Sequence, residues 1–393
     1  MQLNRIVSLT ACAIVIGALG PGGQAQAGST WGQPQEISSN FGRDVQLSDS
    51  GQVAAWIRTN RVALQSSGPV RTAVYRGAKK GWTDSAQMPG TAESTSLQLS
   101  ADGNSLLVVN EEGVGIATRS SSTNVWAPPA SVVADKYLMY ARMSDDAGTV
   151  VWVTNDGFDR RLRATTRNAD GTWSPPVTIG AASAYAYFSG VDPALALSKT
   201  GTMVVWLGEG KALQSSVRTA DGTWSSPLTI KTYGGWTELF GIRLSNDGSR
   251  LGWFRDDADG AFTTTWSGSA WSAVDNITVD KVTDLELSPS GKYAAWANEN
   301  GKVKVAGLSN GQFSTASVVG KGAAILPDVL LSNTSVAWAQ QGGGDLRASL
   351  RKSGTWQPSV KVGKHAIHPA MSADGKTVAW SMTGKKRIYS VKR

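Results

Sequence analysis

The feature that most constrains the fold is an internal repeat of roughly 40–50 residues. In each copy a serine ends a short apolar run, a turn follows, and a second run carries tryptophan eight residues after the serine. The copies contain Ser48, Ser100, Ser144, Ser198, Ser245, Ser288, Ser332 and Ser372; the second has valine instead of tryptophan, and the seventh is two residues shorter. A chain of 393 residues with such a repeat is predicted to form one large repeat domain.

A second element lies between these copies, with an aromatic residue, proline at +3 and an aliphatic residue at +6. Its clear and weaker copies begin at Trp31, Trp82, Trp126, Trp173, Trp224, Trp271, Phe313 and Trp356. The two repeat positions account for 14 of the 16 tryptophans, so most of this tryptophan excess is structural. Proline inside a strand indicates an outer edge, where a missing hydrogen-bond donor is tolerated.

Each unit is predicted to be a four-stranded antiparallel sheet. Turns such as Ala101-Asp102-Gly103 supply the positive φ that a hairpin needs. Four-stranded units at this spacing predict an all-β fold, a β-propeller of eight blades, with seven as the alternative. The mature chain begins with a fourth strand at Trp31–Ile37 and ends after a third at Arg387–Val391. We therefore expect the N-terminal strand to complete the last blade and close the ring.

The Ser-x-Asp-Gly turn followed by an aliphatic-aliphatic-Trp strand resembles WD40-like repeats of the TolB type (PD40), over nearly the whole mature chain. The turns at Asp170–Trp173 and Asp221–Trp224 also resemble the Asp-box of sialidase-type propellers, but are one residue short between Asp and Gly. The resemblance implies a propeller fold and says little about function, because such folds host many activities.

Residues 1–27 are predicted to be a secretory signal peptide. Arg5 precedes the apolar run Ile6–Leu19, and Ala25-Gln26-Ala27 has the small residues of a cleavage site. The run is too short to span a bilayer, and no other stretch suggests a transmembrane segment. The alternative, a lipoprotein anchored at Cys12, is disfavoured because the apolar run continues behind this only cysteine. We expect a secreted protein, in the extracellular space or the cell envelope, with one propeller domain at 28–393, no disulfide and a monomeric state.

The loops that join blades, and those between second and third strands, vary most, so binding is expected on that rim. Aromatic residues gather in three consecutive blade-to-blade loops. The candidate ligand-binding residues are Tyr137, Tyr185, Tyr187, Tyr233 and Trp236. The pattern predicts stacking on a sugar ring or an extended peptide; the alternative is that these side chains pack between blades.

Positive charge is concentrated near the C-terminus, where residues 351–393 contain ten Lys or Arg and one Asp. The candidate patch comprises Lys361, Lys364, Lys385, Lys386 and Arg387. It predicts weak binding to anionic polymers, or else a solvated surface. The absence of interleaved aromatics argues against specific binding of single-stranded nucleic acid.

No cofactor or metal site is predicted. Asp256, Asp257 and Asp259 lack the later acidic ligand of a calcium loop, and His365 and His368 lack a third zinc ligand. Five recurring arginines, Arg76, Arg119, Arg167, Arg218 and Arg351, are interpreted as structural, stacked on the outer tryptophans.

Catalysis is less favoured than binding, because no nucleophile elbow is present. A sialidase-like site would need arginines, a tyrosine and two acids. Residues of these types, Arg142, Arg160, Arg161, Tyr140 and Asp192, are not joined by any motif.

The leading hypothesis is a secreted propeller that binds an extracellular carbohydrate or a protein segment through its variable rim. The alternatives are a glycan-cleaving, sialidase-like hydrolase with its site in the central funnel and a protein-docking scaffold at the cell envelope. Two carboxylates roughly 5–10 Å apart in the funnel would favour the hydrolase. The sequence does not name the ligand.

Overall fold

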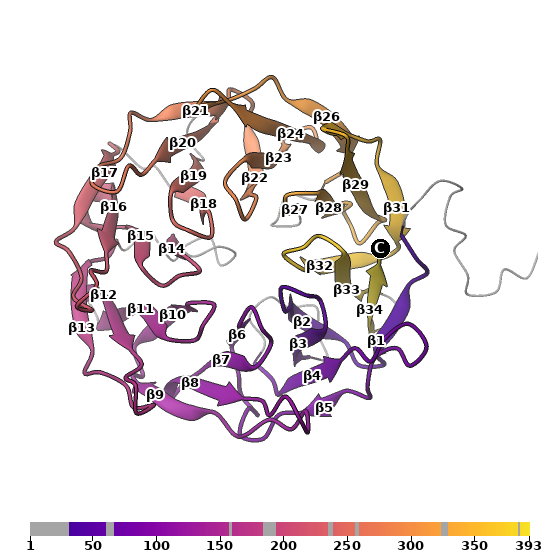
Figure 1. Ribbon diagram of the computed structural model, residues 1–393, viewed down its shortest axis with the longest axis horizontal. Coiled ribbons are helices and arrows are strands. Elements are labelled where there is room, and N and C mark those ends of the chain that lie inside the picture. The colour runs from indigo at the N-terminus through magenta and orange to yellow at the C-terminus, as the bar shows by residue number, and fades with distance from the viewer. Residues whose placement is uncertain are drawn as a thin grey trace, which may run out of the picture.

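Eight antiparallel sheets form a closed ring in the computed structural model (Figure 1). The structure describes residues 31–59, 67–156, 159–183, 194–234, 239–255, 259–323, 329–383 and 386–393. The only helical element in these ranges is a 3₁₀ turn at Glu209–Lys211. The predicted signal peptide, residues 1–27, lies outside the described residues and stays a prediction.

Each sheet is one blade, with its strands in chain order from the centre of the ring outward. Blades 1 to 4 consist of β2 (Gly42–Leu47), β3 (Val53–Arg58), β4 (Val70–Val74) and β5 (Ala86–Gln87); β6 (Ser96–Leu99), β7 (Ser105–Asn110), β8 (Gly113–Thr118) and β9 (Ala130–Ala134); β10 (Leu138–Met143), β11 (Thr149–Asp156), β12 (Asp159–Thr166) and β13 (Val177–Ala181); and β14 (Leu195–Leu197), β15 (Met203–Leu207), β16 (Ala212–Val217) and β17 (Leu228–Thr232).

Blades 5 to 8 continue the same order. They consist of β18 (Leu239–Leu244), β19 (Arg250–Arg255), β20 (Ala261–Thr265) and β21 (Asp275–Thr278); β22 (Val282–Leu287), β23 (Tyr293–Asn298), β24 (Lys302–Ser309), β25 (Gln312–Phe313) and β26 (Ser317–Lys321); β27 (Val329–Leu331), β28 (Ser335–Ala339), β29 (Leu346–Lys352), β30 (Thr355–Trp356) and β31 (Val360–Gly363); and β32 (Ala366–Met371), β33 (Thr377–Met382), β34 (Arg387–Lys392) and β1 (Gln35–Ser38). In blades 6 and 7 the fourth strand is split into two segments that both pair with the third.

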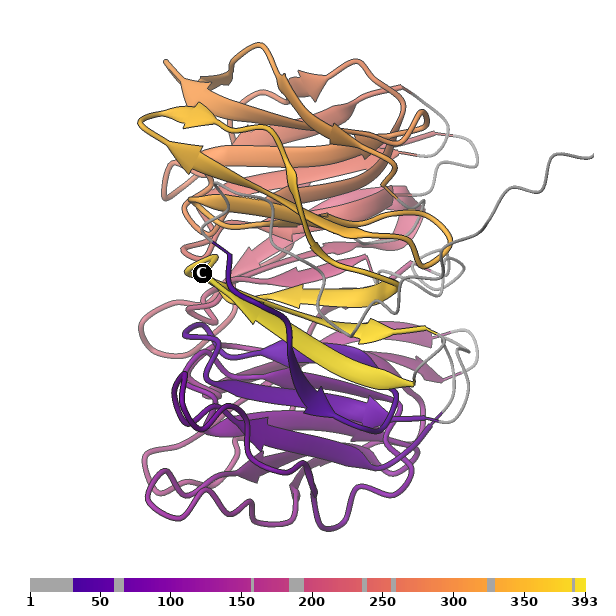
Figure 2. The ribbon, with the colours of Figure 1, turned by 90° about the vertical axis from the view of Figure 1, so that its right-hand side faces the viewer.

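The ring closes through the N-terminal strand, as the sequence predicts. Strand β1 pairs antiparallel with β34, with Gln35 opposite Ser390. The Arg387 guanidinium and the Glu36 carboxylate add an ion pair at 2.5 Å. Figure 2 shows this strand lying along the C-terminal strand, although the two are at opposite ends of the chain. The predictions of eight blades and of this closure are confirmed.

The repeated serine holds the turn between first and second strands. The Ser245 hydroxyl accepts a hydrogen bond from the Arg250 backbone N–H at 2.9 Å and donates to Asp247 at 2.6 Å. Equivalent bonds from the backbone N–H five residues later reach Ser48, Ser100, Ser144, Ser198, Ser288 and Ser372. Ser332 accepts from Ser335 instead, which accounts for the shorter seventh copy.

Repeated tryptophans fill the interfaces between blades. Seven second-strand indoles, from Trp56 to Trp380, are among the largest fully buried side chains of the described residues. Glycine on the preceding blade makes room for several of them: a Cβ on Gly363 would lie 2.6 Å from Cζ2 of Trp380. The core is therefore divided into layers, each shared by two neighbouring blades.

Candidate functional site

Strand order gives the ring two different faces. The turns from first to second and from third to fourth strands lie on one side, which we call the turn face. The loops from second to third strands and from blade to blade lie on the other, the loop face. In Figure 2 the C-terminus marks the turn face, because β34 is a third strand that runs toward it.

The turn face is tied together around the central opening. In several blades the residue after the repeated serine donates its backbone N–H to the next blade: Asp145 N–H donates to the Lys199 carbonyl at 2.8 Å, and Lys199 N–H donates to the Asn246 carbonyl at 3.0 Å. Asp49 N–H bonds the Ala101 carbonyl in the same way. These bonds make the turn face a structural rim.

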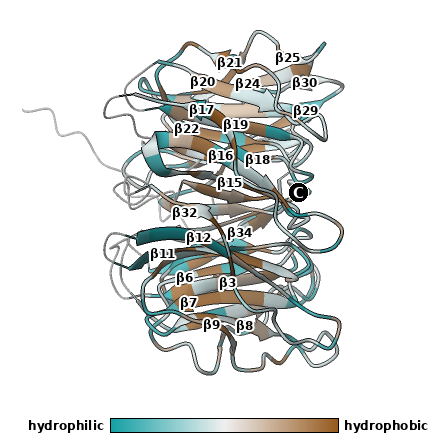
Figure 3. Cartoon of the chain, turned by 90° about the vertical axis from the view of Figure 1, so that its left-hand side faces the viewer, coloured by the Kyte–Doolittle hydropathy of each residue, from teal (hydrophilic) through white to brown (hydrophobic). Residues whose placement is uncertain are grey.

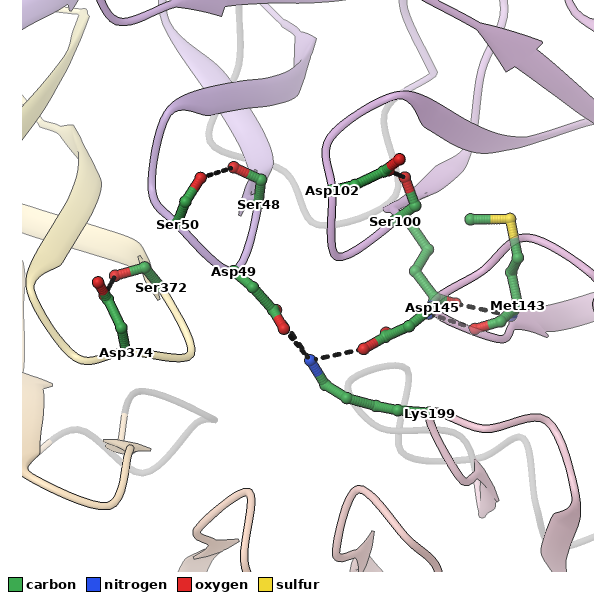
Figure 4. A network of polar contacts seen from close by, with 11 residues as sticks. Ser48, Asp49, Ser50, Ser100, Asp102, Met143, Asp145, Lys199, Ser372 and Asp374 are labelled. Atoms are coloured by element: carbon green, nitrogen blue, oxygen red, sulfur yellow. Dashed lines mark hydrogen bonds and ion pairs between the residues drawn. The ribbon is translucent and has the colours of Figure 1, made fainter.

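A lysine bridge reinforces this rim (Figure 4). Lys199 Nζ from blade 4 lies 2.8 Å from a carboxylate oxygen of Asp49 in blade 1 and 2.9 Å from one of Asp145 in blade 3. Burial raises the pKa of Asp145, and Lys199 lowers it. The ammonium occupies the space between the two carboxylates, where a glycosidic oxygen would have to lie in a hydrolase. We therefore interpret this pair as a link between blades.

A different kind of feature lies on the loop side of the channel, in the innermost strands. Strands β2, β18 and β32 each contain a bulge, where two of their residues lie opposite one residue of the second strand. The bulged residue has a left-handed backbone in all three: Gly241 at φ 56°, Asp44 at φ 49° and His368 at φ 48°. Glycine adopts this conformation freely, whereas aspartate and histidine are strained there.

Asp44 and His368 belong to adjacent blades and influence each other electrostatically. Burial raises the pKa of Asp44, while the charges of Arg43, His368 and Arg142 lower it. Burial also lowers the pKa of His368, with Asp44 acting against this shift. Arg43 is 5% exposed and pairs with Asp44 at 2.7 Å, and it donates to the Thr95 carbonyl at 2.5 Å. Backbone strain in a charged, half-buried cluster is typical of a functional site.

Blade 3 adds a second group of polar side chains. Tyr140 and Arg142 lie on the innermost strand, and Arg160 lies on the third. Burial raises the pKa of the Tyr140 phenol, while Arg142 and Arg160 lower it, so both guanidinium charges act on this hydroxyl. We define Asp44, His368, Tyr140, Arg142 and Arg160 as the candidate site.

The sequence prediction picked out Tyr140, Arg142 and Arg160 only as unconnected residue types, and it considered His368 only as a zinc ligand. The bulge that holds Asp44 and His368 has no sequence signature apart from Gly241 in the equivalent position. Arg161 lies apart from the site and pairs with Asp159 at 2.5 Å. Asp192 lies outside the described residues.

The predicted aromatic residues are placed differently from one another. Tyr137 is 45% exposed on the loop face, with Lys136 Nζ 5.0 Å from its ring centroid. Tyr233 is 8% exposed; its hydroxyl accepts a hydrogen bond from Trp253 Nε1 at 2.7 Å, and the Arg255 guanidinium lies 4.9 Å from its ring centroid. Tyr185, Tyr187 and Trp236 lie outside the described residues. Ligand binding by this set stays a prediction.

The predicted basic patch contains both paired and exposed cations. Lys361 pairs with Asp345 at 2.6 Å and Arg387 pairs with Glu36, whereas Lys364 and Lys386 are exposed. Lys385 lies outside the described residues. Binding of anionic polymers by these residues stays a prediction.

The recurring arginines lie on the turn face, where their side chains contact the turns of their own blade or a ring nearby. Arg119 donates to the Gly103 carbonyl at 2.9 Å and to Asn124 and Asn104, and Arg351 lies 4.7 Å from the Tyr293 ring centroid. Arg119, Arg167 and Arg218 each form a backbone bridge to the outer tryptophan. The arginines thus meet these tryptophans through the backbone, and the ring that Arg351 covers belongs to a tyrosine. Among the described residues, no hydrogen bond, ion pair or ring contact of the Arg76 side chain is seen.

Two other sequence candidates were metal loops. Asp256 and Asp257 lie outside the described residues. The described ranges contain no group of three or more His, Cys, Asp or Glu side chains placed to hold a metal ion. Within the same ranges, no helix is both long and apolar enough to cross a bilayer.

The fold and the ring of repeats define this chain as a WD40-like β-propeller. Among solved structures, it is similar to the propeller of Dos1, with a TM-score of 0.58, 9% identity and coverage of 92% of this chain and 94% of that one. The C-terminal WD40 domain of Sif2 gives a TM-score of 0.58 at 12% identity, covering 92% and 98%. Sqt1 from Chaetomium thermophilum gives 0.57 at 14% identity, covering 92% and 97%.

These identities show the fold alone. No protein-family model matches the sequence, and no curated protein matches it significantly. Function must therefore be argued from the site.

Proposed function

We propose that the chain is a secreted binding protein that captures an extended protein segment at the loop side of its central channel. The observation that carries the proposal is the strained pair Asp44 and His368. Both occupy a left-handed bulge position that blade 5 fills with glycine. Since glycine would relieve the strain, the two side chains are best explained by a role in binding.

The two faces of the ring support the same proposal. The turn face is occupied by repeated serine turns and by backbone bonds between blades. The loop side carries the charged side chains that differ from blade to blade. The scaffold is also like that of the Sif2 WD40 domain, and a rigid ring of this kind can present variable loops for binding. Secretion is part of the proposal and rests on the N-terminal pattern of residues 1–27.

The test is a selection of random displayed peptides against the mature protein, Gly28–Arg393, followed by affinity measurements on the selected peptides. We expect His368→Ala to weaken the binding at least 10-fold, because a half-buried anchor beside the channel is lost. Val125→Ala is the matched control, since Val125 is 65% exposed on the opposite, turn face. The proposal is wrong if no peptide is selected, or if both variants bind as well as the wild type.

Carbohydrate binding is a second candidate, supported by the exposed ring of Tyr137 beside Lys136. Aromatic faces stack on sugar rings, and a neighbouring cation suits an acidic sugar. Retention on a polysaccharide affinity gel that Tyr137→Ala abolishes would favour this candidate over the protein segment.

A further inference from the structure

The blade 3 residues of the candidate site share one face of their sheet. Register places Tyr140 and Leu162 on either side of Val153, and Asn155 directly opposite Arg160. Side chains two residues apart along a strand point to the same side. Tyr140, Arg142, Asn155 and Arg160 therefore lie on the side that carries Val153 and Leu162, which pack against blade 4.

This group is strongly polar and extends along the blade, with Asn155 and Arg160 at the loop end and Arg142, opposite Val151, nearer the turn end. Figure 3 shows the loop end of β12 in the most hydrophilic colour of this side of the ring. The Arg142 and Arg160 charges both act on the Tyr140 hydroxyl, as their effect on its pKa shows.

Two polar atoms of the group have unused hydrogen-bonding capacity. Arg160 Nε and Asn155 Oδ1 are buried, and neither has a hydrogen-bond partner among the described residues. The neighbouring Asp159 does not serve Arg160, because it pairs with Arg161. A buried guanidinium N–H without an acceptor is costly, so such a group is expected to find its acceptor in a ligand.

We propose that Arg160, Arg142 and Tyr140 form a carboxylate-binding site, which receives an acidic residue of the captured protein segment. A guanidinium fork matches the two oxygens of a carboxylate, and a phenol O–H donates to the same anion. Asn155 then accepts from a backbone N–H of the segment. This inference names the anchor of the proposed function and so rests on it.

The direct test observes the arginine itself. The Nε–H resonances of ¹⁵N-labelled mature protein are recorded during titration with N-acetylglutamate amide, with N-acetylglutamine amide as the neutral isostere. The Arg160 resonance is identified by its loss in Arg160→Gln. It is expected to shift saturably with the glutamate probe and to stay in place with the glutamine probe.

Variants distinguish binding at a specific site from nonspecific attraction to positive charge. Arg160→Gln and Arg142→Gln are expected to weaken glutamate binding at least 10-fold, and Arg160→Lys to restore part of it. Arg161→Gln is the matched control on the same strand, because Arg161 already pairs with Asp159. The proposal is overturned if Arg161→Gln weakens binding as much as Arg160→Gln, or if sodium chloride at equal ionic strength shifts the Arg160 resonance as the glutamate probe does.

Peptides selected against the protein distinguish this inference from the proposed function. If the selected peptides bind equally well when their glutamates and aspartates are replaced by the corresponding amides, binding of a protein segment is supported and the carboxylate-binding site is refuted. If no peptide is selected but the glutamate probe binds through Arg160, the carboxylate-binding site is supported and the proposed binding of a protein segment is refuted. Binding of polygalacturonate without any peptide would likewise make an acidic polysaccharide the occupant and overturn the peptide.

Discussion

Replacing His368 by glycine tests whether this residue is kept for function at the expense of stability. His368 has φ 48°, and Pro369 follows it, which narrows its backbone choices further. A left-handed conformation costs a non-glycine residue about 1–2 kcal/mol. Glycine removes that strain but loses about 0.5–1 kcal/mol through the greater freedom of the unfolded chain. The unfolding free energy of the variant should therefore equal that of the wild type or exceed it by up to about 1.5 kcal/mol.

A comparison with His368→Ala separates the effect of backbone strain on stability from the effect of losing the imidazole. Alanine removes the imidazole but keeps the strain, so His368→Gly should be the more stable of the two by about 1 kcal/mol. Urea unfolding at neutral pH, followed by tryptophan fluorescence, measures both variants. A loss of more than about 2 kcal/mol in His368→Gly would refute the argument, because it would mean that the ring packs the core.

The pH dependence of the same variants gives an independent check. Burial lowers the pKa of His368 in the fold, so below the unfolded value of about 6.5 the unfolded chain binds a proton that the folded protein does not. The wild type should therefore lose stability as the pH falls below about 6.5, down to the lowered pKa. Both variants should lose less over the same interval; parallel pH profiles for all three proteins would contradict this.

Two further predictions concern the turn face. Ser245→Ala leaves the buried Arg250 backbone N–H without its acceptor, so the unfolding free energy should fall by about 1–3 kcal/mol in urea titrations, with a smaller loss for Ser249→Ala, whose side chain is partly exposed. Lys199→Met leaves Asp49 and Asp145 close together without their shared cation; because these groups are partly exposed, the loss at pH 7 should be about 1 kcal/mol or less. Protonation of either carboxylate relieves their mutual repulsion, so the thermal stability of the variant relative to wild type should recover on acidification toward pH 4. An unchanged deficit would exclude the bridge as its cause.

The ring architecture could be predicted from the sequence because the same physical requirement recurs in every blade. Each serine accepts from a backbone N–H of its own turn, and each second-strand tryptophan fills an interface with the preceding blade. Because each of these residues has the same structural role in every blade, it recurs in the sequence at a fixed spacing. The complementary ends of the chain then identified the closure through β1 and β34.

The candidate site could not be predicted in the same way, because its members meet only in the folded ring. Asp44 and His368 are near opposite ends of the chain, and their blades become neighbours only when the ring closes. The sequence predicted aromatic residues as ligand-binding candidates, but one of them, Tyr233, is buried and accepts a hydrogen bond from the indole of Trp253. Composition shows which side chains are unusual, but not which of them the neighbouring blade covers.

A repeat protein nevertheless offers an internal comparison that a single domain lacks. The residue four positions before each repeated serine lies in or directly beside the innermost strand of its blade, and this position varies while the serine does not. Across the described blades this place holds Asp44, Ser96, Tyr140, Ala194, Gly241, Asp284 and His368. A purely structural position would be expected to converge on one solution, as the serine does. The variation therefore indicates that these side chains are not required for the stability of the fold. Functional experiments should begin with these positions around the channel and then turn to the exposed loops.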